Sequence, residues 1–467
     1  MTLIRVGETL PDNTWTRAMI ARSAAGAMIC SAFVQTLVPN AWSEGSQWLY
    51  VDLLLALILS LTGTEQEVAF LVGLLLPFVA VEPAPYDVLV GVLLVVRWTS
   101  PTLIAWLRKP SPVMLRLEDW FLVAFVVGSI ISTYVNRGNY FFVAVTMYLL
   151  SSYVAFRCLG PSVGKALVAG YVSGALFEYL SVSVWRLLNE PFLSKVMFGW
   201  RVKGTFKDPN VYGAFFIPLL LGSVDALICG NWANKATRRS VILFVLATIS
   251  AHAILTSYSR GAVVATAVGV LILVFMRLRN GPSVLYKTIT LSVVIPIIAF
   301  SLETAVISAQ NFLYEKNSDV ATQVQDRVGL KPYDNRRFGV QLAALALAPS
   351  HPLGIGPGRI LDRFNYDAHS LFIRVLVENG WIAFVGMLGW IGQVLFRLLV
   401  EPNEGTIGVH SPALVAAISA FCVDSLVIST LHWRHFWLLF AAATVAVGLV
   451  RGANGMRAEH CSGGDKV

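Results

Sequence analysis

The chain has 467 residues, of which 56% are hydrophobic and only 13% charged, and its formal net charge is +8. A soluble domain of this size carries roughly twice that charged fraction, so the composition excludes an ordinary soluble protein. The basic residues are dispersed between apolar runs rather than gathered in one patch, which argues against a nucleic-acid partner. Five cysteines without CxxC or His-paired spacing indicate neither a disulfide framework nor a metal site.

Apolar runs long enough to span a bilayer recur along most of the chain, and they predict an all-α, polytopic integral membrane protein. We expect about 12–14 transmembrane helices. In chain order the candidate runs lie near residues 18–38, 47–62, 66–81, 84–106, 118–135, 139–158, 162–182, 210–229, 239–257, 261–276, 284–303, 369–396, 411–430 and 433–450. The third run is short and lies close to the second, which is why the expected number is a range.

The distribution of Lys and Arg between these runs predicts how the protein lies in the membrane. With a cytoplasmic N-terminus, the inner connections hold most basic residues of the short loops, among them Arg97, Arg108, Lys109, Lys235, Arg238 and Arg239. The short outer connections are almost bare, because 39–46 and 82–83 have no Lys or Arg and 136–138 has only Arg137. Two longer segments, 183–209 and 304–368, then lie on the outer face.

This pattern predicts three parts of the chain. N-terminal transmembrane helices occupy 1–182, a core occupies 183–450 and includes the outer loops 183–209 and 304–368, and a cytoplasmic tail occupies 451–467. A loop as long as 304–368 is uncommon unless it has structure or function of its own. Its end, 336–349, has apolar residues among small ones and predicts a short amphipathic helix at the membrane surface.

The first motif is Arg-Val-Lys-Gly-Thr-Phe-Lys-Asp-Pro-Asn at 201–210, which leads into the eighth span. Asp208 followed by Pro209 is typical of a helix N-cap and the first helical residue, so a helix should begin there on the outer face. Its free N–H groups would suit a diphosphate, together with the cations of the motif, Arg201, Lys203 and Lys207. A capped helix with cations that reach the lipid headgroups is an equally good interpretation of these residues alone.

Two further motifs open later spans on the same face. Thr256-Ser-Tyr-Ser-Arg260-Gly261 opens the tenth span, and a single Arg there is by itself more often a headgroup anchor. His351-Pro-Leu-Gly-Ile-Gly-Pro-Gly358 precedes His369-Ser370; it is not a P-loop, and we expect it to shape the loop that returns to the membrane. His369 is expected in the first turn of the twelfth span. A His there is commonly an interface residue, but a neutral imidazole can also accept a proton from an attacking hydroxyl.

Other ionisable residues fall inside or at the ends of the predicted spans. Glu178, Glu378 and Asp424 are costly in a membrane, so we expect each to be paired or functional. His432, Arg434 and His435 open the last span on the outer face, where they either line a cavity or anchor the helix at the interface.

In their order along the chain, the three motifs resemble those of the O-antigen ligase and O-antigen polymerase superfamily of bacterial membrane glycosyltransferases. The Arg-x-x-Gly-Thr-Phe-x-x-Pro-Asn pattern matches 201–210, and the Thr-x-Ser-Arg-Gly type of turn matches 257–261 as Ser-Tyr-Ser-Arg-Gly. Pro-Leu-Gly-Ile-Gly-Pro-Gly and His369-Ser370, with Gly380 after nine intervening residues, complete the pattern. The resemblance covers about 200–390. Ala383 departs from the Gly, Thr or Tyr that is usual in ligases, which leaves a polymerase open.

The resemblance implies a GT-C-like glycosyltransferase that needs no metal or other cofactor. It would lie in the bacterial inner (cytoplasmic) membrane with its active site facing the periplasm, and would transfer glycan from undecaprenyl diphosphate to an acceptor sugar hydroxyl. Arg201 and Arg260 would bind the diphosphate leaving group, and His369 would orient or deprotonate the acceptor hydroxyl. The expected substrate-binding residues also include Lys203, Lys207, Asn210 and Ser370.

Three functions remain open at this point. The first is a polymerase for exopolysaccharide or O-antigen, and the second is an O-antigen ligase that attaches glycan to the lipid A core of lipopolysaccharide, with acceptor choice in 304–368. A transporter or flippase for the lipid-linked glycan predicts cations throughout the bilayer depth and inverted repeats, and the sequence shows neither. The expected partners are the lipid bilayer, the undecaprenyl-diphosphate-linked glycan, an acceptor glycan or lipid A core, and other polysaccharide-assembly proteins, but no nucleic acid.

Overall fold

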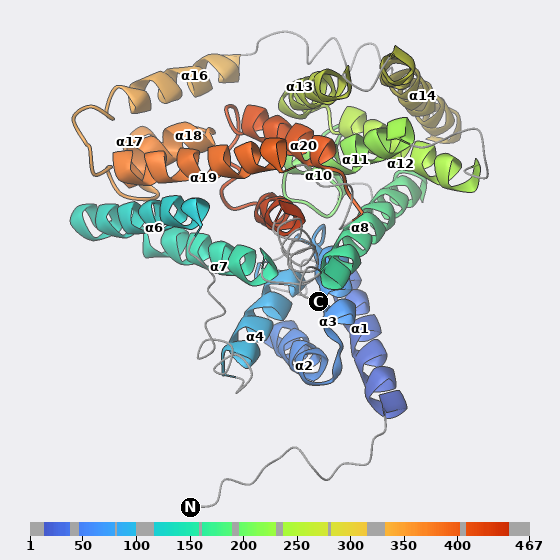
Figure 1. Ribbon diagram of the computed structural model, residues 1–467, viewed down its shortest axis with the longest axis horizontal. Coiled ribbons are helices and arrows are strands. Elements are labelled where there is room, and N and C mark those ends of the chain that lie inside the picture. Colours follow the sequence, from blue (N-terminus) through green and yellow to red (C-terminus); the bar gives the residue numbers. More distant parts are fainter. Residues whose placement is uncertain are drawn as a thin grey trace, which may run out of the picture. The chain divides into compact units, whose positions relative to one another are not determined.

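The computed structural model describes residues 14–37, 46–79, 82–99, 116–157, 161–188, 196–229, 237–278, 282–314, 332–401 and 408–447. These residues are almost entirely helical (Figure 1), which confirms the predicted all-α fold. Within them, eight helices are long and apolar enough to cross a membrane, and five shorter apolar helices have 10–17 residues. The protein is therefore a multi-pass membrane protein. A total of 12–14 spans requires the shorter helices to cross as well, and it stays a prediction.

The helices fall into two compact units, and the first is formed by residues within 1–109 and 166–174. It contains α1 Thr14–Leu37, α2 Ser46–Thr62, α3 Glu65–Leu75, α4 Pro85–Thr99 and part of α8 Pro161–Leu188. Helix α3 begins with a capping box between Thr64 and Glu67. A Cβ on Gly170 of α8 would stand 1.9 Å from the carbonyl oxygen of Phe70, so the backbones of α3 and α8 touch.

The second unit, within 110–165 and 175–467, contains all three sequence motifs. Its elements are α6 Leu117–Asn136, α7 Tyr140–Arg157, the rest of α8, strands β1 Met197–Phe198 and β2 Arg201–Val202, α10 Pro209–Phe215, α11 Ile217–Cys229, α12 Thr237–Thr256, α13 Arg260–Arg277, α14 Pro282–Tyr314, α16 Pro332–Leu345, α17 Arg359–Phe364, α18 Leu371–Arg374, a π-helical turn Val375–Asn379, α19 Gly380–Val400, α20 Ser411–Asp424 and a last helix Arg434–Val447.

Small residues bring α6 and α19 of this unit into backbone contact. A Cβ on Gly128 would lie 2.5 Å from the backbone nitrogen of Ala383, and one on Gly386 would lie 2.4 Å from that of Phe125. In a membrane such close approach replaces the hydrophobic effect as the source of helix association. Ala383, the residue that departs from the ligase pattern, is thus fully buried in a helix contact.

Several element ends differ from the predicted ones. Helix α14 continues to Tyr314 instead of ending near 303, and α16 spans 332–345, slightly earlier than the amphipathic helix predicted at 336–349. Helix α20 ends at Asp424 rather than near 430, because the carbonyl of Ser425 accepts a hydrogen bond from Leu371 N across the unit. The predicted tail 451–467 lies outside the described residues.

Candidate active site

The first motif folds as a tight hairpin followed by a helix start. Strands β1 and β2 are antiparallel with Met197 opposite Val202, and the amides of Lys203 and Gly204 both donate to the carbonyl of Val196. Gly204 has φ +59°, which disfavours a side chain. The motif therefore bends sharply back toward the helices before it reaches Asp208.

A buried carboxylate of α8 holds this bend. Glu178 accepts hydrogen bonds from the backbone N–H of Thr205 at 2.7 Å and from its hydroxyl at 2.8 Å. Its side chain is fully buried, so pairing satisfies a group that would otherwise be costly in the membrane. This confirms that Glu178 is paired, and it gives that residue a role in shaping the motif.

Helix α10 begins where the sequence predicts. Asp208 Oδ1 accepts from the N–H of Asn210 at 2.6 Å, and Pro209 is the first helical residue. Lys207, beside this cap, is exposed, and Lys203 is partly buried. The N-terminus of α10 thus lies among the cations of the motif.

Arg201 joins the first motif to the second. Its Nε donates to the carbonyl of Ser257 at 2.9 Å, and its Nη2 donates to Oδ1 of Asn210 at 2.9 Å. Next to this contact the rings of Trp200 and Tyr258 meet edge to face, with centroids 4.5 Å apart. The structure therefore brings two segments together that are more than fifty residues apart in the chain, with the guanidinium between them.

The second motif is a strained turn that delivers Arg260. Tyr258 has φ +47°, and Ser259 caps α13 by accepting from Ala262 N at 3.2 Å, so that Arg260 is the first residue of the helix. The next residue is Gly261, where a side chain would not fit because a Cβ would lie 2.5 Å from Oδ1 of Asp424. Arg260 is consequently presented, partly buried, at the helix start, and the glycine after it packs against the buried side chain of Asp424.

Asp424 was one of several candidates in the sequence, and the structure places it at this junction. Its side chain is 1% exposed, and Oδ2 has no hydrogen-bond partner among the described residues. The charges of Asp208 from the first motif and Arg337 from α16 both act on it. A buried carboxylate with an open acceptor position, close to groups from three segments, is typical of a functional site.

The glycine-rich third motif wraps around the π-helical turn of 375–379. The amide of Ile355 donates to Val377 O at 2.8 Å and that of Gly356 to Glu378 O at 3.0 Å. Glu378 Oε1 in turn accepts from Ile360 N, at the start of α17, at 3.1 Å. Gly354, Gly356 and Gly358 all have positive φ, so the run shapes the returning loop, as its sequence predicts.

His369 does not lie in the first turn of a helix, so that prediction is wrong. Ser370 is the N-cap of α18, and its Oγ accepts from Ile373 N at 3.5 Å. The hydroxyl of Ser370 also lies 3.4 Å from the carbonyl of Ser425, to which it donates. Because Ser370 takes the cap, His369 stays outside the helix in a left-handed conformation with φ +47°.

The surroundings of His369 favour its neutral form. Desolvation lowers the pKa of its imidazole below the usual value, Arg337 and Arg374 lower it further, and Asp367 and Asp208 oppose the shift. The ring packs edge to face on Tyr366 at 5.3 Å. A neutral imidazole can accept a proton, and the influence of Asp208 shows that the first and third motifs are close enough for their charges to interact.

Two arginines that the sequence reasoning did not select support the His369 segment. Arg374 is 7% exposed; it donates to Asp367 Oδ2 at 3.0 Å and lies 3.4 Å from Glu378 Oε2. Arg337 of α16 reaches the carbonyl of His369 at 3.5 Å. The i,i+4 spacing of Arg374 and Glu378 was a visible signal for the first pair. No local pattern points to Arg337.

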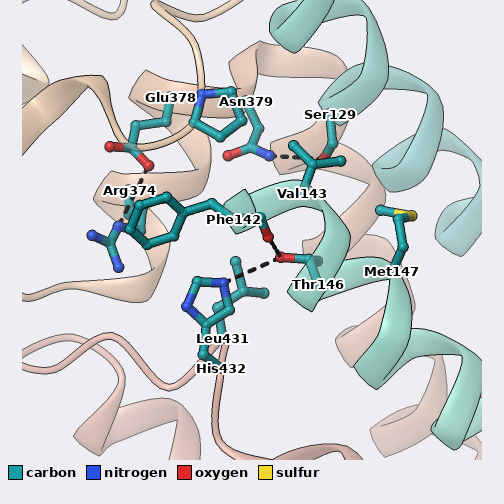
Figure 2. A pocket seen from close by; sticks show the side chains of 11 residues that line it. Ser129, Phe142, Val143, Thr146, Met147, Arg374, Glu378, Asn379, Leu431 and His432 are labelled. Atoms are coloured by element: carbon teal, nitrogen blue, oxygen red, sulfur yellow. Dashed lines mark hydrogen bonds and ion pairs between the residues drawn. The ribbon is translucent and has the colours of Figure 1, made fainter. Parts of the chain in front are cut away.

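A pocket lies beside this segment (Figure 2), and its lining includes Ser129, Phe142, Thr146, Arg374, Asn379 and His432. The imidazole of His432 stacks on Phe142 at 5.4 Å, and its Nε2 is 3.3 Å from Thr146 Oγ1. Figure 2 shows the Arg374 guanidinium next to the Glu378 carboxylate at one side of this pocket. His435 is instead buried among aromatic rings, including those of Phe215 and Phe421, both with centroids 5.5 Å away.

One group of potential metal ligands occurs in the part of the chain that the structure describes. Atoms of Asp225, Cys229 and His410 lie within 4.8 Å of one another. Both carboxylate oxygens of Asp225 already accept from Arg277, at 2.8 and 2.9 Å. A dication there would be repelled by the guanidinium, so the group is explained by an ion pair.

One known family matches part of the chain, over the second and third motifs. Residues 243–388 match the family described as O-antigen ligase, a range that includes Arg260 and His369. No curated protein matches the chain. The family match confirms the resemblance predicted from the motifs, and it supports a membrane glycosyltransferase of the O-antigen ligase or polymerase type in general.

Proposed function

We propose that the protein transfers glycan from undecaprenyl diphosphate to an acceptor sugar hydroxyl at the periplasmic face of the bacterial inner membrane, and that it acts as a polysaccharide or O-antigen polymerase. The observation that supports this most directly is the Arg201 guanidinium, which lies between the first and second motifs at 2.9 Å from both Ser257 and Asn210. The charge of Asp208 also acts on His369, which supports placing the imidazole in the same site as the cations of the first motif.

In the proposed reaction His369 accepts the proton of the acceptor hydroxyl. The hydroxyl oxygen attacks the anomeric carbon, the bond from that carbon to the diphosphate oxygen breaks, and its electron pair stays on the diphosphate. Arg201 and Arg260 stabilise the charge that develops there, a contribution of about 2.7–4 kcal/mol for one preorganised donor. A single displacement of this kind inverts the anomeric configuration, and NMR of the product checks it.

In this proposal the remaining predicted residues add charge to the site or hold its main residues in position. Lys203 and Lys207 add positive charge around the start of α10, where the helix dipole also favours an anion. The free N–H groups expected there from the sequence are already bonded, because those of residues 210–212 donate to Asp208. Asn210 acts by holding Arg201, and Ser370 by capping α18 so that His369 stays at the helix entrance. Asp424 has an open acceptor position beside Gly261 and is proposed to bind a sugar hydroxyl there.

Turnover of undecaprenyl-diphosphate glycan by purified protein in EDTA tests the proposal. We expect the wild type to release undecaprenyl diphosphate, and Arg260→Ala and His369→Ala to lose this activity by 100-fold or more, the order of loss for one transition-state contact. Arg363→Ala is the control, since Arg363 is an exposed cation of α17. Full activity of both site variants would show that the motif residues are not catalytic, and metal dependence of the wild type would refute metal-independent transfer.

A ligase is the second candidate, because the matched family is described as O-antigen ligase. The same assay separates the two when it is supplied with both acceptors. Growth of the lipid-linked chain identifies a polymerase, and transfer to lipid A core identifies a ligase. Movement of the intact lipid-linked glycan across vesicles without release of the diphosphate would instead identify a flippase.

A further inference from the structure

A buried network of four polar side chains lies in helices α8, α12 and α14, outside the proposed site. Arg186 binds Glu303 with two hydrogen bonds, from Nη1 at 3.0 Å and from Nη2 at 2.8 Å. His252 Nε2 lies 3.1 Å from the same carboxylate, and His252 Nδ1 lies 2.9 Å from the hydroxyl of Tyr179. The four residues are between 1% and 9% exposed. We call this set the Glu303 network.

The chemistry of the groups sets the direction of its hydrogen bonds. A carboxylate held by an arginine on both oxygens is ionised and only accepts, so His252 donates to Glu303 from Nε2. The other ring nitrogen of a neutral imidazole then accepts the proton of the Tyr179 hydroxyl. Every contact has one suitable arrangement, and the three helices are therefore locked in one relative position.

Each helix of the network leads into a segment of the proposed site. Tyr179 follows Glu178, the residue that holds Thr205 in the first motif. His252 lies about one turn before the Ser257 carbonyl that binds Arg201. Helix α14 carries Glu303 and Gln310, whose amide donates to Arg186 O at 2.8 Å, and the next described helix along the chain is α16, which carries Arg337.

The network also reaches the motifs through its charges. Arg186 lies within electrostatic range of the phenol groups of Tyr212 in α10 and Tyr258 in the second motif, and Glu303 lies within range of Tyr212. We propose that Glu303 is a positioning residue: through Arg186 and His252 it holds α8 and α12 so that Arg201 meets the Ser257 carbonyl. This inference rests on the proposed function, since what it positions is the diphosphate-binding contact.

A second buried ion pair in the same unit provides a matched control. Asp225 of α11 and Arg277 of α13 also form two hydrogen bonds, with 0% exposure of the Asp225 side chain, but they lie at the helix ends opposite the motifs. If the Glu303 network only stabilises the protein, then Glu303→Gln and Asp225→Asn have the same consequences. If the Glu303 network positions the motifs, then only Glu303→Gln changes turnover and amide exchange in the motif segments.

The test measures turnover and hydrogen exchange on the same purified variants. We expect both Glu303→Gln and Asp225→Asn to lower the unfolding temperature, and only Glu303→Gln to lower kcat by roughly 10–100-fold, the effect of a small misplacement of a catalytic contact. We expect its amide exchange to rise in 196–210 and 254–262. Asp225→Asn should leave exchange in these two segments and kcat as in the wild type.

Two variants of His252 and one of Tyr179 make the test independent of whether Glu303→Gln folds. His252→Gln retains a donor and an acceptor and should preserve kcat, whereas His252→Ala retains neither and should lower kcat. Tyr179→Phe removes one hydrogen bond and should lower kcat by a smaller factor. Equal behaviour of the Gln and Ala variants, or no change of exchange in the two motif segments, would overturn the positioning role. If the wild type itself shows no glycan transfer, the proposed function fails, and the exchange data alone decide whether the network holds the motifs.

Discussion

A methyl group at position 204 should damage the first motif far more than the same change five residues earlier. Gly204 and Gly199 both have positive φ, +59° and +62°. A Cβ on Gly204 would lie 1.9 Å from Oε1 of Glu178 and 2.9 Å from the Tyr212 ring, whereas a Cβ on Gly199 would meet nothing within 4 Å. The two substitutions therefore separate backbone strain from the collision with the carboxylate.

The structure gives the size of each effect. Forcing a non-glycine residue into the left-handed region costs about 1–2 kcal/mol, and this is the whole expected cost of Gly199→Ala. Gly204→Ala carries the same strain and also pushes Glu178 away from both hydrogen bonds to Thr205. A buried polar group that loses its partners costs about 1–3 kcal/mol more, so we expect a total of about 2–5 kcal/mol for Gly204→Ala.

Unfolding of the purified variants by titration with sodium dodecyl sulfate in mixed micelles measures these free energies. Turnover should follow the same order, because Gly204 lies between Arg201 and the helix cap at Asp208. Equal destabilisation by the two alanine substitutions would refute the conclusion that the Glu178 carboxylate holds the bend.

Three further predictions concern the site itself. Arg201→Lys keeps the charge but cannot reach both of its acceptors, so kcat should fall by about 10–100-fold in the lipid-release assay in comparison with the wild type. Because burial lowers the pKa of His369, its imidazole stays neutral to more acidic pH than a free histidine. The acid limb of the kcat/KM profile should therefore lie below about pH 6.5, and it should disappear in His369→Gln. Gly261→Ala would place a Cβ 2.5 Å from a buried carboxylate oxygen and should abolish turnover, whereas Gly222→Ala, with open space around its Cβ position, should not.

Hydropathy and capping chemistry allow much of the fold to be predicted from the sequence. A bilayer requires about 20 apolar residues per helix, so the runs themselves mark most helices. The start of α10 at Pro209 was predictable because Asp208 and Pro209 satisfy a helix end through local contacts. The order of the motifs also predicted the family that residues 243–388 match.

Local patterns failed where a distant partner decides the local conformation. His369 was expected in the first turn of a helix, but Ser370 takes the cap, and its hydroxyl reaches Ser425, which directly follows α20. Helix α20 ends early for a related reason, since the same Ser425 carbonyl accepts from Leu371. The extension of α14 to Tyr314 goes with the contact between Gln310 and Arg186, which no property of the α14 sequence reveals.

The sequence by itself therefore determined the membrane class, most of the helices and the identity of the candidate residues. Only the tertiary structure decided that Arg201 lies on the Ser257 carbonyl, that Glu178 closes the first motif, and that Arg337 and Asp424 join the site. Hydrophobic length and helix capping are properties of neighbouring residues, so they can be predicted locally. A hydrogen bond between segments depends on how α8, α12, α13 and α20 pack, and that packing is a property of the whole chain.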